Sequence, residues 1–190
     1  GTPPAPAQVI IADQLPNPYA KSLSPKTYFP CYFIFSCYFS LYTIVLGAED
    51  GTASSLITAL ETLERYYPPF RGYNLQAHLS ELHSDSSSNF LSEEFDTYAK
   101  SKNFSIHTSA PYHQEQNGPA ERAWQTLHLI AFKMLCHTRL SRHYFHEALM
   151  YAQQIYVVLP IKGLFLQIDD AFIPTTPFDK YYQVRATQIS

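Results

Sequence analysis

Three acidic residues occupy positions from which a folded chain could bring them together. Asp13 ends the apolar run Gln8–Asp13, Asp85 follows the run Ala77–Ser84, and Glu121 lies in the first turn of a predicted helix. Carboxylates without histidine or cysteine partners suit hard cations such as Mg²⁺ or Mn²⁺. Two such ions, about 3.5–4 Å apart, can activate a water or a 3′-hydroxyl and stabilise the leaving oxygen of a phosphoryl displacement.

Each of these acids also has a simpler explanation. An aspartate after a strand is commonly a turn residue, and an acid such as Glu121 in a first helical turn complements the helix dipole. Asp50 competes with Asp13 for the place of the first acid. It stands in the turn Gly47–Gly51, directly before a helical pattern, where Asp50 or Thr52 is better explained as a helix cap.

The elements that would position the acids alternate between strands and helices. Runs rich in β-branched and aromatic residues predict strands, with a hairpin as the second and third, at Gln8–Asp13, Phe29–Cys37, Phe39–Leu46, Ala77–Ser84 and Phe104–Thr108. Helical spacing predicts helices at Ala53–Tyr66, Glu93–Lys100 with Ser92 as cap, Pro119–His137 and Arg142–Val158. The order indicates an α/β domain with a mixed sheet of about five strands flanked by helices. Residues 159–190 are rich in proline and weakly patterned.

Composition fits one globular domain and sets a limit on DNA binding. The chain has 190 residues, 46% of them hydrophobic, with a formal net charge of −3. Proteins that bind DNA alone are usually basic, so DNA contacts would come from a local patch or from flanking domains. The three cysteines form no CxxC pair, which predicts neither a disulfide framework nor a zinc module and favours a reducing compartment.

The uncharged stretch Thr27–Ala48 is long enough to cross a bilayer as a helix. Its tyrosine, phenylalanine, threonine, isoleucine and valine residues favour strands instead, and Ser36 and Ser40 offer a place for a turn. We therefore predict a buried hairpin and no membrane contact, with a membrane span as the alternative.

A second set of motifs resembles a known family. Asp85 and Glu121 are separated by 35 residues, and Tyr112–Gln125 reads YHQEQNGPAERAWQ. This is similar to the integrase core of long-terminal-repeat retrotransposons, closest to the copia type, with its D-D-35-E signature and its loop PYxxxxNGxxER. Phe145–Ala152 (FHEALMYA) resembles the family's FWxEAxxxA helix. The resemblance covers about residues 8–182, so we expect a catalytic core over 1–182 and, over 183–190, a tail leading to a downstream region.

The resemblance implies an RNase H-like fold and a metal-dependent polynucleotidyl transferase that processes DNA 3′ ends and joins them to a target. It makes Asp13, Asp85 and Glu121 the catalytic residues and the ligands of two Mg²⁺ or Mn²⁺ ions. It implies DNA contacts from the loop and the following helix, at Tyr112, His113, Gln114, Gln116, Asn117, Arg122, Gln125 and His128. It further implies DNA as partner, a homo-oligomer, flanking integrase domains of a polyprotein, and action in the nucleus with a cytoplasmic particle otherwise.

The chain departs from the family after its second acid. Where the family has D-N-G-G-E-F, Asp85 is followed by Ser86-Ser87-Ser88-Asn89-Phe90. Glycines allow positive φ and a close approach to substrate, so their loss could perturb the loop beside the metals. The alternative function is therefore a decayed or domesticated integrase-like module that binds nucleic acid or oligomerises without catalysis.

Overall fold

The computed structural model describes residues 8–19, 29–66, 79–85, 88–108, 118–168 and 171–181. The strands are β1 (Val9–Pro16), β2 (Cys31–Cys37), β3 (Thr43–Ala48), β4 (Glu81–Ser84), β5 (Ser105–Thr108), β6 (Phe165–Ile168) and β7 (Ala171–Pro174). The helices are α1 (Ala53–Tyr66), α2 (Glu93–Lys102), α3 (Gly118–Thr138) and α4 (Phe145–Val158), with a 3₁₀ turn at Arg142–Tyr144.

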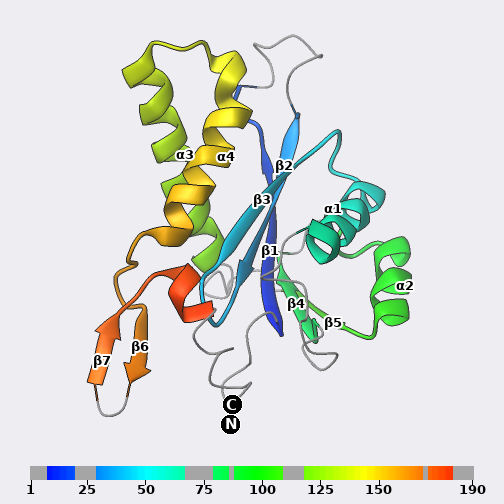
Figure 1. The fold of residues 1–190 in the computed structure, drawn as a ribbon. Helices are drawn as coiled ribbons and strands as arrows, with labels where there is room; N and C mark the ends of the chain where they lie inside the picture. The colour runs from blue at the N-terminus through cyan, green and yellow to red at the C-terminus, as the bar shows by residue number, and fades with distance from the viewer. Residues whose placement is uncertain are drawn as a thin grey trace.

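Five of the strands form a mixed sheet in the order β3-β2-β1-β4-β5. The pairs β1–β2 and β2–β3 are antiparallel, as hairpin connections require, whereas β1–β4 and β4–β5 are parallel and are reached through helices. This arrangement confirms the predicted α/β class and the five-stranded sheet flanked by helices (Figure 1).

Helices cover both faces of the sheet, and the inner strand β2 is buried along its whole length. Because successive side chains of a strand point to opposite faces, Phe33 and Phe35 enter the core beneath α1 and α2. Tyr32 and Ile34 enter the core beneath α3 and α4. The antiparallel strands therefore belong to two cores at once, which accounts for their nearly continuous apolar sequence.

A buried polar contact fixes α4 against the edge of the sheet. The Gln153 side chain is 8% exposed, and its Oε1 accepts a hydrogen bond from the backbone N–H of Val45 at 2.7 Å. β3 is the outermost strand of the five-stranded sheet, so its outward N–H groups lack a neighbouring strand. Gln153 supplies one of the missing acceptors from the helix above.

The apolar stretch folds as the predicted hairpin. β2 and β3 pair from Cys31↔Ala48 to Ser36↔Thr43, and a buried hydrogen bond of 2.8 Å joins the Ser36 and Thr43 hydroxyls near the turn. Over the described ranges, none of the helices combines the length and the apolar character that crossing a bilayer requires.

Three regions differ from the sequence-based expectations. The second strand of the hairpin begins at Thr43 rather than Phe39, because residues 38–40 form the turn. β1 continues beyond Asp13 to Pro16 because β2 pairs with it up to Pro16↔Cys31, and a proline is tolerated where a strand ends. The region after Val158 is more ordered than its weak pattern suggests. β6 and β7 form a separate two-stranded hairpin, and Tyr181 at the end of a short helix (177–181) is fully buried in the core beneath α1 and α2.

Candidate active site

One predicted acid, Asp13, lies on β1, and a second, Asp85, directly follows the neighbouring strand β4. The parallel pairing of β1 with β4 matches Ile11 with His83, and continuing this register by two residues places Asp13 beside Asp85. Adjacent strands run about 4.8 Å apart, and residues in register point to the same face. The sequence predicted Asp13 at the tip of its strand, which is wrong, because β1 continues to Pro16. Asp13 lies instead at the level of the sheet where β4 ends and Asp85 follows.

Glu121 acts on this pair from the first turn of α3. Burial, then the nearby charge of Asp85 and, less strongly, that of Glu121 together raise the pKa of Asp13 from its ordinary 3.8 to about 6, against the opposing hydrogen bond from the Gln14 N–H. Like charges disfavour ionisation only over short distances. The electrostatics therefore indicate that the three carboxylates lie near one another, while their joint binding of cations stays a prediction.

A chain of hydrogen bonds connects the surroundings of the two aspartates. Asp13 Oδ1 accepts from the Gln14 backbone N–H at 2.8 Å, and Gln14 Oε1 accepts from Asn89 Nδ2 at 2.6 Å. Asn89 is buried, whereas the family pattern has a glutamate at its position. Because Asn89 follows Asp85 in the chain, its contact ties the segment after the second acid to the strand that carries the first. The departure from the family pattern thus supplies a positioning contact.

Gly51 leaves the space that this contact needs. A Cβ atom on Gly51 would lie 1.8 Å from Gln14 Nε2, well inside van der Waals contact. Any larger residue would move the Gln14 amide, and with it the partner of Asn89.

Asp50 is occupied in a different way. Its Oδ1 accepts hydrogen bonds from the Thr52 N–H at 3.0 Å, the Thr52 hydroxyl at 2.6 Å and the Ser55 hydroxyl at 2.6 Å. The bonds from Ser55 and Thr52 lower the pKa of Asp50. Thr52 Oγ1 in turn accepts from the Ser55 N–H at 3.3 Å, so of the two predicted candidates Thr52 caps α1 and Asp50 supports it.

The predicted DNA-contacting residues fall into two groups. Five of them lie outside the described residues: Tyr112, His113, Gln114, Gln116 and Asn117. The other three lie on α3, where Arg122 and Gln125 are exposed and Gln125 Nε2 approaches Glu121 Oε1 at 3.4 Å, as expected for residues four apart. A role for these residues in binding DNA stays a prediction.

His128, the third of these residues, lies half-buried in an aromatic cluster. Its ring lies 5.6 Å from the Phe145 ring, 6.0 Å from that of Trp124 and 6.4 Å from that of Tyr19. Burial in this aromatic cluster lowers the pKa of His128. The ring therefore packs between α3 and α4, and its contact with DNA stays a prediction.

Sequence reasoning missed one group of ligand-type side chains. Among the residues that the structure describes, the group whose ligand atoms lie within 4.8 Å of one another consists of Glu81, His83 and His107. The alternation E-x-H in one strand was the available signal. It becomes informative only once β5 is known to place His107 opposite His83.

Comparison with known proteins gives a short sequence match and a likeness of fold. No family model matches the chain. The Pro-Pol polyprotein of feline foamy virus is 41% identical over 54 residues, which is 28% of this chain and 5% of the polyprotein. The chain thus spans a small fraction of that relative's length.

Three of the similar solved structures are retroviral. The simian T-cell lymphotropic virus intasome in complex with the PP2A regulatory subunit B56 gamma has a TM-score of 0.63 at 17% identity, over 94% of this chain and 55% of the intasome chain. The HTLV-2 integrase catalytic core domain in complex with magnesium has TM-scores of 0.63 in its dimeric form and 0.64 in its trimeric form. Both are 17% identical over 93% of this chain and 97% of theirs. The chain therefore has the RNase H-like fold of the retroviral integrase catalytic cores to which it is similar.

Proposed function

We propose that this chain is the catalytic core of a DNA strand-transfer enzyme, a polynucleotidyl transferase that processes DNA 3′ ends and joins them to a target. The observation that carries the proposal is the placement of Asp13 beside Asp85, within electrostatic reach of Glu121. The fold shared with integrase cores supports it. The copia-type assignment rests on the motifs at Tyr112–Gln125 and Phe145–Ala152.

The donor set fits Mg²⁺ or Mn²⁺. Asp13, Asp85 and Glu121 offer only carboxylate oxygens, and burial together with the charges of Asp85 and Glu121 raises the pKa of Asp13, a penalty on its charge that a cation would relieve. When bound, two such ions would supply activation of the attacking hydroxyl and stabilisation of the leaving oxygen. The magnesium-bound HTLV-2 cores support the same choice of ion.

The chain's own residues hold the proposed metal ligands in place and leave them accessible to DNA. Asp13 is held by backbone pairing of β1 with β2, and Asp85 directly follows β4, which pairs with β1 in the same sheet. Glu121 is exposed on α3, as a group that meets a large substrate must be. Arg122 beside it is exposed and can neutralise a phosphate.

The proposed partners are the element's DNA ends, target DNA, further copies of the chain and flanking domains of a polyprotein, with action in the nucleus. Exposed apolar side chains on α3 and α4 support association between copies: Leu129, Phe132, Tyr151, Ile155 and Val158. The net charge of −3 is consistent with flanking domains that contribute DNA affinity.

An end-joining assay tests the proposal. The purified chain is incubated with labelled duplex oligonucleotides and supercoiled plasmid in Mn²⁺ or Mg²⁺, and nicked or joined products are separated by electrophoresis. We expect metal-dependent products that disappear in Glu121→Gln, while Glu94→Gln, the same change at an exposed position of α2, retains them. Equal activity in Glu121→Gln would refute the assigned roles.

The serines that follow Asp85 favour a second candidate, a module that keeps the fold but no longer catalyses. Calorimetry with Mg²⁺ separates the two. Heat of binding and a higher unfolding temperature in the parent chain, both lost in Asp85→Asn, support the enzyme. Their absence from the parent supports the non-catalytic module.

A further inference from the structure

β4 and β5 carry a polar face opposite α1 and α2. Leu82 of β4 is fully buried in the core beneath these helices, and Ile106 of β5 packs against the same core. The alternate residues of both strands point the other way. On that side Glu81 and His83 are partly exposed and His107 is exposed.

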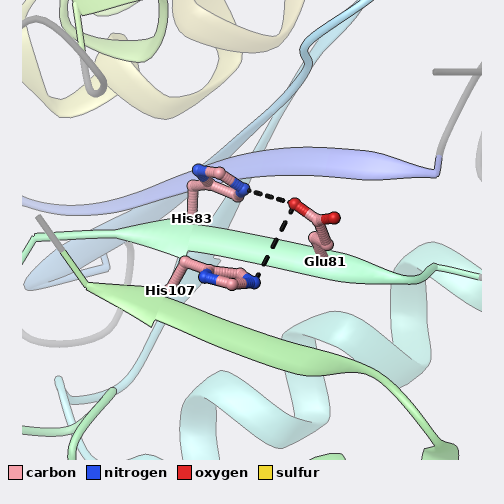
Figure 2. A group of neighbouring side chains, drawn as sticks. All are labelled: Glu81, His83 and His107. Atoms are coloured by element: carbon pink, nitrogen blue, oxygen red, sulfur yellow. Dashed lines mark hydrogen bonds and ion pairs between the residues drawn. The ribbon is translucent and has the colours of Figure 1, made fainter. Parts of the chain in front are cut away.

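The strand register brings these three side chains together. Glu81 and His83 are two residues apart on β4, and His107 is the partner of His83 on β5. Figure 2 shows both histidines turning a ring nitrogen toward one carboxylate oxygen of Glu81. The Glu81 Oε2 atom lies 2.9 Å from His83 Nε2 and 3.9 Å from His107 Nε2. The two rings are 5.0 Å apart between centroids.

We propose that Glu81, His83 and His107 bind a Zn²⁺ ion, with water completing its coordination. Two imidazoles and one carboxylate are a ligand set that zinc uses when it keeps an open position. Ligand atoms of a tetrahedral zinc site lie about 3.3 Å from one another, given Zn–N distances of about 2.0–2.1 Å. The present separations, all within 4.8 Å, need only small side-chain rotations to reach that value.

The surroundings permit these rotations. The His107 side chain is 51% exposed and that of Glu81 is 42% exposed, so neither is locked by packing. His107 Nε2 also lies 3.1 Å from the Ser105 hydroxyl, which itself donates to the Ser80 carbonyl at 3.1 Å. Metal binding would exchange the His107–Ser105 contact for a Zn–N bond, and Ser105 would keep its bond to Ser80.

This site differs in chemistry from the carboxylate trio. Imidazole nitrogens favour zinc and similar transition metals, whereas Mg²⁺ prefers an all-oxygen set. Glu81 and His83 occupy β4 itself, while Asp85 follows the strand. A bound ion would link β4 to β5, an edge strand of the sheet, and would stiffen the strand that leads into Asp85.

Titration calorimetry of the full chain with ZnCl₂ under reducing conditions tests the proposal, with unfolding temperature as a second measurement. We expect one zinc equivalent and a higher unfolding temperature that EDTA reverses. His83→Ala and His107→Ala should each weaken binding by more than the roughly 10–100-fold that loss of an outer partner causes. Glu81→Gln, which keeps the size of the side chain, should weaken it as well.

Three control variants define the site. His143→Ala removes another exposed histidine and should leave zinc binding unchanged, as should Cys136→Ser, which removes the exposed thiol. Asp85→Asn should also retain the zinc equivalent, which separates this site from the carboxylate trio. The proposal is overturned if the parent binds no zinc, or if the His83→Ala/His107→Ala double variant, with its circular dichroism spectrum intact, binds as the parent does.

Discussion

Asp13→Asn should stabilise the metal-free protein at neutral pH, although the change removes a proposed catalytic group. The pKa of Asp13 rises from 3.8 to about 6 on folding because burial, Asp85 and Glu121 all disfavour its charge. The folded state therefore holds the proton more tightly than the unfolded chain does. Stability is lost as pH rises through the window from about 4 to about 6, and the loss is complete above it.

The size of the effect follows from the same values. A rise from 3.8 to about 6 corresponds to roughly 3 kcal/mol of unfolding free energy at neutral pH. Asp13 is only partly buried, so solvent screening reduces this to about 1–2 kcal/mol. Asparagine is neutral and keeps an oxygen for the Gln14 N–H, which now donates to Asp13 at 2.8 Å. The substitution therefore removes the charge and retains the local hydrogen bond.

Urea unfolding in EDTA at pH 4 and pH 7.5 measures the effect. We expect the unfolding free energy of Asp13→Asn to exceed that of the parent at pH 7.5 and to match it closely at pH 4. Asp50→Asn is the control of opposite sign, because hydrogen bonds from Ser55 and Thr52 lower the pKa of Asp50 in the folded state. Its contribution to stability is present above the unfolded pKa, so this variant should lose stability at pH 7.5.

Two results would refute the reasoning. A parent that is as stable as Asp13→Asn at pH 7.5 would mean that neither burial nor the neighbouring carboxylates disfavour the charge of Asp13. An equal gain at both pH values would mean that the substitution acts through packing rather than through ionisation. Millimolar Mg²⁺ should reverse the order of stability at pH 7.5, since only the parent keeps the full set of carboxylates.

Three further substitutions test the framework around the site. Gln153→Leu should lower the unfolding free energy by about 1–3 kcal/mol, because it leaves the buried Val45 N–H without an acceptor. Gln154→Leu, at the exposed neighbouring position, should change the unfolding free energy little in the same urea titration. Ser92→Ala should lower it by about 1 kcal/mol, since Ser92 Oγ caps α2 by accepting from the Phe95 N–H at 3.2 Å, and Ser92→Asp should restore most of the loss. Gly51→Ala should displace the Gln14 amide from Asn89 and reduce end-joining in the electrophoretic assay. Asn89→Ala should show a similar loss. Unchanged joining in both variants would exclude a positioning role for the contact between Gln14 and Asn89.

The sequence predicted correctly those elements that depend on residues close to one another in the chain. Helical spacing gave α1 its observed bounds, Ala53–Tyr66, because Leu56, Leu60 and Leu63 all face one core. Ser92 was predicted as a cap, and it accepts the expected hydrogen bond. These features depend on side chains three or four positions apart, which a sequence displays directly.

Features set by pairing between distant segments were missed. β1 extends past Asp13 because β2 continues to pair with it, and no residue near Asp13 signals that partner. β6 and β7 have four residues each and pair only with one another, too short for alternation to be recognised. The neighbourhood of Glu81, His83 and His107 likewise depends on the β4–β5 register.

The two proposed cation sites lie close together along β4, so the charges of their ligands decide whether both can be filled. Glu81, His83 and Asp85 alternate along one line with a rise of about 3.3 Å per residue, so His83 and Asp85 are only about 7 Å apart along the strand. Two bare divalent ions so close would repel one another strongly. Three carboxylates at one site and Glu81 at the other would leave each site, when filled, with a charge of roughly +1, which reduces the repulsion. Glu81 would therefore decide whether zinc and magnesium can be bound together, and in Glu81→Gln any remaining zinc should be displaced by Mg²⁺ more readily than in the parent.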